Sequence, residues 1–341
     1  MVKRYGSVLW TLVIILILFT IHVYIRFFTP PAGKARDVVI VVPKGSSFIF
    51  VARELQGAGV IRNAHDFSLL ASLKDAHTRV KAGEYRFTTP VRPLTVLHKL
   101  VRGETRKYRI TFPEGVTMGE IAVLLDKEGL VKKGDFIEKA SDAGFAASRG
   151  LDGATFEGYL FPDTYHMTKG MSAEDIIDVM VARFKEVYTD SMAARGARLG
   201  LTQREVVTLA SIIEKESGNP EERRYISAVF HNRLKKRIPL QSDPTVIYGL
   251  SDFDGNLTRR HLRTRTPYNT YLFYGLPPGP IANPGRGALE AAVEPVKGEY
   301  LYFVSKNDGS HYFSKSLREH NRAVERYQKK RRHIKKAGPN G

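Results

Sequence analysis

The residues best suited to chemistry lie at the end of an amphipathic helix, in the run Glu214-Lys215-Glu216-Ser217. At about 100° per residue, the side chains of Glu214 and Glu216 point about 200° apart and cannot share one cleft as a catalytic pair. Glu216 falls at the edge of the apolar stripe and at the helix C-terminus, two settings that raise a carboxyl pKa. A glutamic acid that stays protonated near neutral pH can serve as the general acid of glycosidic-bond cleavage. The competing interpretation is ordinary, because most glutamates at helix ends are solvated or paired with Lys or Arg.

The helix that presents these glutamates has a clear beginning and end in the sequence. Thr202 and Glu205 have the spacing of a capping box. Gly218 is suited to the left-handed position that follows a helix. The apolar stripe between them consists of Val206, Leu209, Ala210 and Ile213. Farther along the chain, two short strands around Asn307-Asp308-Gly309 predict a β-hairpin, with the Asp-Gly pair where the turn needs positive φ.

Two segments after this helix supply polar and aromatic side chains that we expect to line a groove with Glu216. In the first, Asp243 as N-cap and Pro244 at the first helical position predict a short helix. The second, residues 266–285, is rich in Pro, Gly and Tyr. Its aromatic and amide groups suit contacts with sugars, although its composition fits an ordered structural loop at least as well. The expected substrate-binding residues are Gln241, Asp243, Thr245, Tyr248, Asn269 and Tyr271.

The N-terminus predicts a membrane anchor. An uncharged stretch from Tyr5 to Ile25 follows Lys3 and Arg4, and about 20 apolar residues suffice for a helix to cross a bilayer. We expect an uncleaved transmembrane helix over residues 7–28, with residues 1–6 cytoplasmic. A cleaved signal peptide is less favoured, because no good small-residue cleavage site follows. The expected location is the inner (cytoplasmic) membrane, single-pass, with the body periplasmic or otherwise extracytoplasmic.

Two stretches between the anchor and the glutamate helix resemble each other. Val38–Gly45 and Tyr108–Gly115 each read as a strand that runs into a Pro/Gly turn. Each copy then predicts two helices and a closing aromatic strand, at Gly83–Phe87 and at Gly158–Phe161.

The resulting units, residues 37–105 and 106–156, loosely resemble the LysM-like modules of cell-wall proteins. Such a module is either a carbohydrate binder or a spacer that holds the next domain away from the membrane.

Composition narrows the possible functions. The chain has 341 residues, 43% of them hydrophobic, so it can bury a sizeable core in two or three domains. The absence of cysteine excludes disulfides, thiolate metal sites and a cysteine nucleophile. A net charge of +18 favours a polyanionic partner or surface. Part of that charge belongs to a basic tail over residues 329–341, and the anchor argues against nucleic acid as the partner.

Four motifs in order, with a fifth stretch before them, resemble the MltG (YceG-like) endolytic murein transglycosylases. The resemblance runs from the N-terminal anchor to about Tyr327 and excludes the basic tail. The residues that carry it are Leu209–Glu216, Leu240–Gly249, Tyr268–Tyr271 and Gly275–Ile281, preceded by Glu157–Tyr165.

The resemblance implies an α/β (α+β) protein with an N-terminal transmembrane helix, LysM-like modules and a mixed α/β catalytic domain over residues 157–328. It implies a lytic transglycosylase that cuts the MurNAc–GlcNAc bond of nascent peptidoglycan strands, leaves a 1,6-anhydroMurNAc end and terminates elongation. In this family the acid is the second Glu of the Glu-Lys-Glu motif, here Glu216. The substrate's own 6-hydroxyl is the nucleophile, so no metal or organic cofactor is implied. The implied partners are glycan strands, the membrane and the peptidoglycan synthases.

Two alternatives stay open. A water-using muramidase would cut the same bond and leave reducing ends. A non-catalytic peptidoglycan-binding scaffold would cut nothing, and the intact surroundings of Glu216 argue against it.

Overall fold

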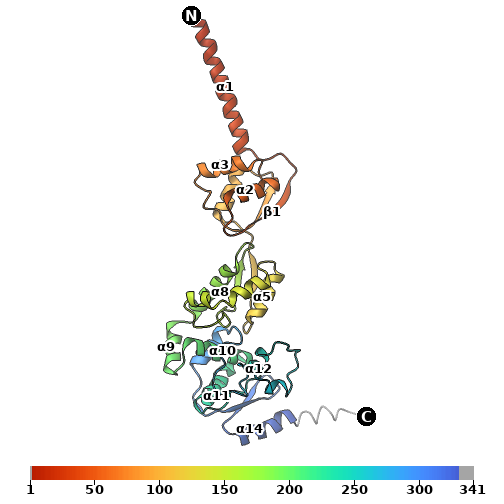
Figure 1. Cartoon of the computed structure of the whole chain (residues 1–341), viewed down its shortest axis with the longest axis vertical. Coiled ribbons are helices and arrows are strands. Elements are labelled where there is room, and N and C mark those ends of the chain that lie inside the picture. The colour runs from red at the N-terminus through yellow and green to blue at the C-terminus, as the bar shows by residue number, and fades with distance from the viewer. Residues whose placement is uncertain (1, 330–341) are drawn as a thin grey trace, which may run out of the picture. The chain divides into compact units, whose positions relative to one another are not determined.

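The computed structural model describes residues 2–329, in which the chain forms two compact units (Figure 1). The first contains the residues up to Ile110 together with Tyr165–Ser172, and the second contains Thr111–Thr164 and the described residues from Ala173 on. Helices and short strands occur in both units, as the sequence predicts. Residues 330–341 of the expected basic tail lie outside the described residues.

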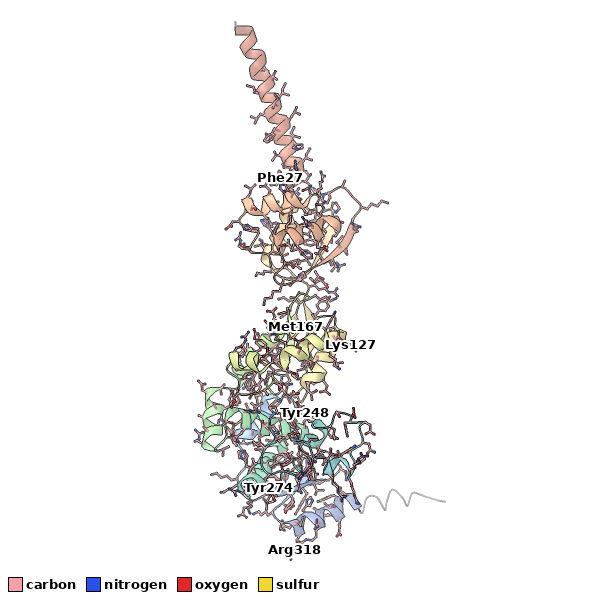
Figure 2. The ribbon with its side chains drawn as sticks, viewed as in Figure 1. Phe27, Lys127, Met167, Tyr248, Tyr274 and Arg318 are labelled. Carbon is pink, nitrogen blue, oxygen red and sulfur yellow. The ribbon has the colours of Figure 1, made fainter. Side chains whose placement is uncertain are left out.

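The first unit begins with a long helix, α1 (Val2–Phe28). Its segment Trp10–Phe28 is long and apolar enough to cross a membrane, by length and composition. An ion pair joins the last turn of α1 to the rest of the unit: Arg26 Nε donates to Asp66 Oδ2 at 2.6 Å. Phe27 packs against the core of the same unit, where Figure 2 labels it.

The body of the first unit has the strand–helix–helix–strand order that the sequence predicts. Strands β1 (Arg36–Val42) and β2 (Gly83–Thr89) pair antiparallel, with Arg36 opposite Thr89 and Val42 opposite Gly83. Between them lie α2 (Phe48–Gly57) and α3 (Ala64–Leu73), and α4 (Pro93–Arg102) follows. Their apolar faces form one core, which includes Ile40, Val42, Val51, Leu55, Phe67, Leu70, Tyr85, Phe87, Val96, Leu97 and Leu100.

The second copy keeps this order but closes with a different strand. It runs through β3 (Tyr108–Thr111), α5 (Met118–Lys127), α6 (Lys133–Ala140), α7 (Ala143–Ser148) and β4 (Thr164–Met167), and β3 pairs with β4. The strand predicted at Gly158–Phe161 is wrong. Gly158 has a φ of +88°, and the Gly158 and Leu160 N–H groups both donate to the Asn283 side chain at 2.9 Å. Residues 111–156 share a unit with the glutamate helix, so the expected boundary at 157 does not separate compact units.

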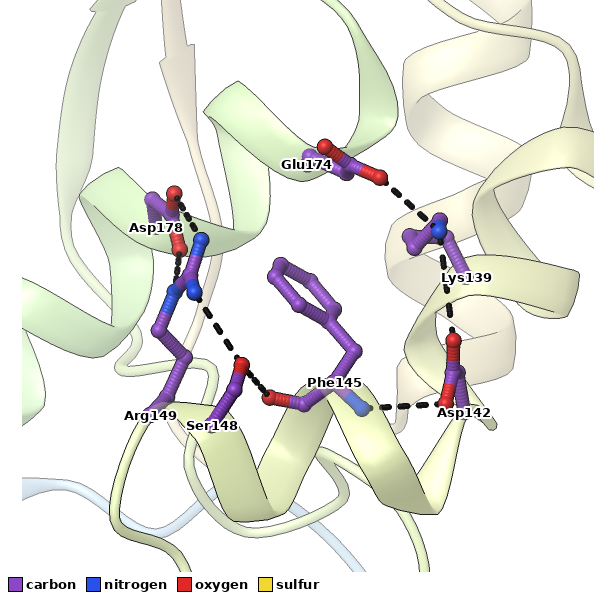
Figure 3. A network of polar contacts seen from close by, with 7 residues as sticks. All are labelled: Lys139, Asp142, Phe145, Ser148, Arg149, Glu174 and Asp178. Atoms are coloured by element: carbon purple, nitrogen blue, oxygen red, sulfur yellow. Dashed lines mark hydrogen bonds and ion pairs between the residues drawn. The ribbon is translucent and has the colours of Figure 1, made fainter.

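A polar network joins the helices of this copy to α8 (Ala173–Val187), as Figure 3 shows. Arg149 Nε and Nη2 bind the two carboxylate oxygens of Asp178 at 2.7 and 2.9 Å. On the other side, Lys139 Nζ lies 2.8 Å from Glu174 Oε1. Both cations also lie over the Phe145 ring, at 4.5 and 5.5 Å from its centroid. A bidentate pair within a network holds its geometry better than an isolated surface pair, so the second copy is held on α8.

The rest of the second unit surrounds one buried helix, α10 (Gln203–Glu216), in which every residue of Val206–Ile213 is buried. Its predicted capping box, Thr202 with Glu205, is confirmed. Its end at Glu216 is also confirmed, but the left-handed conformation predicted for Gly218 is wrong, because the chain leaves α10 through extended Ser217 and Gly218 does not take positive φ. The surrounding helices and strands are α9 (Asp190–Arg198), α11 (Arg223–Lys235), α12 (Asp243–Tyr248), α13 (Arg286–Val293), β5 (Tyr302–Ser305), β6 (His311–Ser314) and α14 (Leu317–Val324).

The predicted hairpin is confirmed, since β5 and β6 pair antiparallel with Tyr302 opposite Ser314. In its turn, Asn307 and Gly309 take positive φ, at 61° and 87°, whereas the sequence predicted positive φ for Asp308 and Gly309.

The proline-rich segment that follows Tyr274 lies along α10. Arg204 donates to the Pro278 carbonyl, the Ile281 N–H donates to Ser211 Oγ at 3.0 Å, and the Gly285 N–H donates to Glu214 Oε2 at 2.9 Å. These contacts occur in the same order along the loop and along the helix. Residues 275–285 are therefore an ordered structural loop, the second of the two interpretations that composition allowed.

Gly158→Ala should destabilise the second unit strongly. A Cβ there would stand 2.5 Å from Pro280 Cγ and 2.8 Å from Val207 Cγ1, at a φ of +88°. The matched control is Gly150→Ala, where φ is +72° and nothing lies within 4 Å of the added atom. The control measures the backbone cost, about 1–2 kcal/mol, and Gly158→Ala should cost roughly 1–3 kcal/mol more through overpacking. If denaturant unfolding shows that both variants lose the same free energy of unfolding, the packing of Gly158 against Pro280 and Val207 is contradicted.

Candidate active site

The two glutamates of α10 have separate partners. Arg223 Nη2 donates to Glu214 Oε1 at 3.0 Å, and the Gly285 N–H donates to the other oxygen. The Glu214 side chain is only 6% exposed, and Arg223 also binds Glu114 at 3.0 Å. Burial raises the Glu214 pKa, against the Gly285 hydrogen bond and the Arg223 charge. Glu214 therefore joins α10 to its neighbours through a buried ion pair.

Glu216 is held by a serine. Ser242 Oγ donates to Glu216 Oε1 at 2.6 Å. Ser242 is the N-cap residue of α12, yet its side chain makes no capping hydrogen bond to that helix. The prediction of Asp243 as N-cap is therefore wrong, because Asp243 is the first residue of α12.

Burial raises the Glu216 pKa, and the hydrogen bond from Ser242 opposes that rise. The nearby charges act in both directions: Asp243 raises the pKa, whereas His311 and Arg233 lower it. The surroundings of Glu216, which the helical wheel indicated as the acid, therefore favour its protonated form.

The loop after α12 fixes Ser242 in place. The Ser242 N–H donates to Thr270 Oγ1 at 3.0 Å, and the Gln241 N–H donates to the Thr270 carbonyl at 3.1 Å. Thr245 Oγ1 lies 2.8 Å from the same Thr270 hydroxyl. Thr245 is fully buried, so it supports the turn that carries Ser242 instead of facing a groove.

Asn269 has a similar supporting position. Its side-chain amide donates to the carbonyls of Leu262 and Thr264 at 3.1 and 2.8 Å and accepts the Tyr271 N–H at 3.0 Å. Asn269 is fully buried. Its amide is therefore used within its own loop, where it shapes the segment that holds Thr270.

Three of the expected binding residues keep exposed surface beside Glu216. Tyr271 Oη donates to Asp243 Oδ1 at 2.6 Å, and Arg233 Nη1 donates to Gln241 Oε1 at 3.4 Å. Gln241 and Asp243 are exposed, and Tyr271 is half-buried. The charge of Glu216 acts on both Tyr271 and Arg233, so these groups surround the same carboxyl.

Tyr248 belongs to a second polar cluster, which is centred on Glu157. Tyr248 Oη lies 3.3 Å from Glu157 Oε2, and the Tyr248 ring meets the Tyr268 ring edge-on at 4.8 Å. Glu157 also accepts the Met118 N–H at 3.0 Å and Asn283 Nδ2 at 3.0 Å. Glu157 is 3% exposed, and this burial raises its pKa to about 7.

Sequence reasoning missed Ser242, Arg233, Glu157 and Asn283 as residues of these clusters. Of these four residues, only Arg233 could have been identified from the local sequence pattern. It follows Val229 and Phe230 at helical spacing, on the apolar face of α11, where a charged group needs buried acceptors. Arg233 Nε and Nη1 bind the carbonyls of Leu301 and Leu240, both at 2.8 Å.

Comparison with known proteins assigns the chain to a family. It belongs to the YceG-like family, whose model matches residues 40–326. The endolytic murein transglycosylase of Bacillus subtilis is 35% identical over 306 residues, which cover 85% of this chain and 84% of that protein. Its namesake in Streptococcus pneumoniae R6 is 29% identical over 329 residues, which cover 86% of this chain but 59% of the longer relative. The crystal structure of a YceG-like protein from Listeria monocytogenes has a TM-score of 0.57 and 34% identity, and the match covers 84% of this chain and 98% of that one.

Glu157→Gln should change how the free energy of unfolding depends on pH. The Glu157 pKa is raised to about 7, from an ordinary value of 4.5, so the folded state favours the protonated form. Stability from this group is complete below about pH 4.5 and is lost as pH rises through 7. At 1.36 kcal/mol per pKa unit, the loss is at most about 3 kcal/mol. In urea unfolding, the free energy of unfolding of the glutamine variant should fall less between pH 5 and 8 than that of the wild type. An identical dependence on pH in the two proteins would contradict this assignment.

Proposed function

We propose that this chain is an endolytic murein transglycosylase, with Glu216 as its catalytic acid. The observation that carries the proposal is a carboxyl at the end of a buried helix, with a raised pKa and a serine donor on one oxygen. The family, and relatives that are endolytic murein transglycosylases, indicate the substrate, which is the glycan strand of peptidoglycan.

The chemistry needs one carboxyl and no water. With Oε1 accepting from Ser242, Glu216 carries its proton on Oε2 and delivers it to the glycosidic oxygen between MurNAc and GlcNAc. As that bond breaks, the 6-hydroxyl of the same muramyl residue attacks C1 and returns its proton to the Glu216 anion. The products are a free GlcNAc 4-hydroxyl and a 1,6-anhydroMurNAc end. Because the nucleophile belongs to the substrate, its effective concentration is high.

The neighbours of Glu216 have distinct parts in this scheme. The Asp243 charge favours the protonated acid at the start and stabilises positive charge that develops at C1. Gln241 and Tyr271 offer polar contacts to the sugar. Beyond them, Phe273 and Tyr274 are 46% and 71% exposed, and their rings suit stacking on further sugar faces.

The N-terminal half supports this work from the membrane. Helix α1 acts as a single-pass anchor, with the catalytic unit on the extracytoplasmic side. The strand–helix–helix–strand body of the first unit is LysM-like in order and serves as a spacer or a glycan holder. An anchored enzyme of this kind meets strands as the synthases extend them.

Glu216→Gln should abolish release of anhydro-ended fragments from purified glycan strands, as followed by mass spectrometry. The change is nearly isosteric, so the fold should persist, and general acid catalysis is worth about 10²–10⁴-fold. Glu214→Gln is the matched control. It should keep most of the activity while it lowers stability by about 1–3 kcal/mol, because it breaks a buried ion pair. Activity lost in the control and kept in Glu216→Gln would reverse the assignment.

Ser242→Ala should move the alkaline limb of the pH–activity profile to higher pH. The active form of Glu216 is protonated, so activity falls as pH rises through its pKa. Removing the hydrogen bond that lowers this pKa shifts the fall upward, while Asp243, His311 and Arg233 still act on the carboxyl. Ser211→Ala is the control, because Ser211 is equally buried on α10 but bonds to the Ile281 N–H. The idea fails if the limb stays in place or if the control moves it equally.

A further inference from the structure

If α1 spans a bilayer, its junction with the body of the first unit sets the depth of α3. The apolar segment Trp10–Phe28 has 19 residues and, at 1.5 Å each, a length of about 28 Å, close to the ~30 Å hydrocarbon thickness. Arg26, two residues before its end, lies about 3 Å along the axis from that boundary. Because Arg26 is bonded to Asp66 of α3 at 2.6 Å, a bilayer crossed by α1 would have α3 at the level of its lipid headgroups.

One face of α3 carries exposed leucines on the side that meets α1. On a helical wheel, Leu73 lies about 20° and Leu69 about 60° from the direction of Asp66. Leu69 is 45% exposed and Leu73 is 74% exposed, whereas Phe67, Leu70 and Ala71 fill the core. The face that Asp66 turns toward the end of α1 therefore also presents two leucines that the unit itself does not cover.

We propose that α3 is an interfacial helix, whose Leu69 and Leu73 enter the boundary between headgroups and acyl chains next to the anchor. The proposal rests on the proposed anchoring by α1 and goes beyond it, since it assigns a second membrane contact. The surrounding charge fits an anionic surface. Arg62 is exposed and donates to the Pro30 carbonyl just after α1, and exposed Lys74 follows α3. Basic groups beside apolar side chains are the usual composition of such surfaces.

This contact would fix how the first unit meets the membrane. Phe27 is packed in the core and Arg26 is bonded to α3, so α1 and the unit meet through more than a flexible linker. Two leucines in the interface add a second attachment beside the span. The unit would then keep one orientation to the bilayer as it holds the next domain near nascent strands.

The chain contains no cysteine, so single labels report single sites. Four full-length variants are reconstituted into vesicles of phosphatidylcholine and phosphatidylglycerol and labelled with an environment-sensitive maleimide dye: Leu73→Cys, Leu69→Cys, Leu18→Cys in α1 and Val39→Cys in β1. Two quenchers are used: a phospholipid spin-labelled near the headgroup end of its acyl chain for Leu69, Leu73 and Val39, and one labelled near the methyl end of the chain for Leu18, which lies near the middle of the span. Val39 is a matched control, because it is an apolar residue 51% exposed in the same unit, on a strand instead of α3. Leu18 reports on the anchor itself.

We expect blue-shifted emission and loss of most of the fluorescence at Leu73 and Leu69, with little quenching at Val39. Quenching at Leu18 but not at Leu73 would overturn the interfacial assignment and leave the anchor standing. No quenching at Leu18 would refute the anchor and with it this inference. Equal quenching at Val39 and Leu73 would contradict a specific face. Protection of Leu73 that depends on protein concentration, without lipid quenching, would assign the surface to a second copy and also overturn the proposal.

Discussion

The second unit depends on the burial of α10, because polar groups at the end of a buried helix must find partners inside the protein. Glu214 meets that demand with Arg223 and the Gly285 N–H, and these contacts help to hold the proline-rich loop along the helix. Glu216 meets it with Ser242 and remains next to exposed polar groups. The same burial raises the pKa of both carboxyls, and we propose that the second uses that property on a substrate.

A supporting layer lies behind the proposed acid. Thr270 binds the backbone N–H groups of Gln241 and Ser242 and the Thr245 hydroxyl, and Asn269 shapes the loop that carries Thr270. These buried hydrogen bonds hold Ser242 in position, and Ser242 in turn orients the Glu216 carboxyl. A proton donor must be held in this way to stay within the short distance that proton transfer needs. Six residues were expected to bind substrate. Asp243 and Tyr271 lie near Glu216, and Gln241 bonds to Arg233, whose charge acts on the same carboxyl. Thr245 and Asn269 support the loop, and Tyr248 bonds to Glu157 in a neighbouring cluster.

Local patterns predicted the helices well, and long-range hydrogen bonds explain the errors. The capping box at Thr202 and the alternation of Glu214 and Glu216 depend only on helix geometry, and both are confirmed in the structure. The predicted strand at Gly158 fails because Asn283, more than 120 residues away, takes its backbone N–H groups. The cap of α12 was misplaced by one residue because the hydroxyl of Ser242 is used by Glu216. No single-sequence pattern reveals such partners.

We propose that Glu216 acts with the substrate's own 6-hydroxyl and without water. Digestion of purified glycan strands in ¹⁸O-labelled water, followed by mass spectrometry of the muramyl ends, tests it most directly. If the 6-hydroxyl is the nucleophile, the muramyl ends should lack one water relative to a hydrolytic product and carry no ¹⁸O. Reducing muramyl ends that each contain one ¹⁸O would show attack by water, and the chain would then be a muramidase.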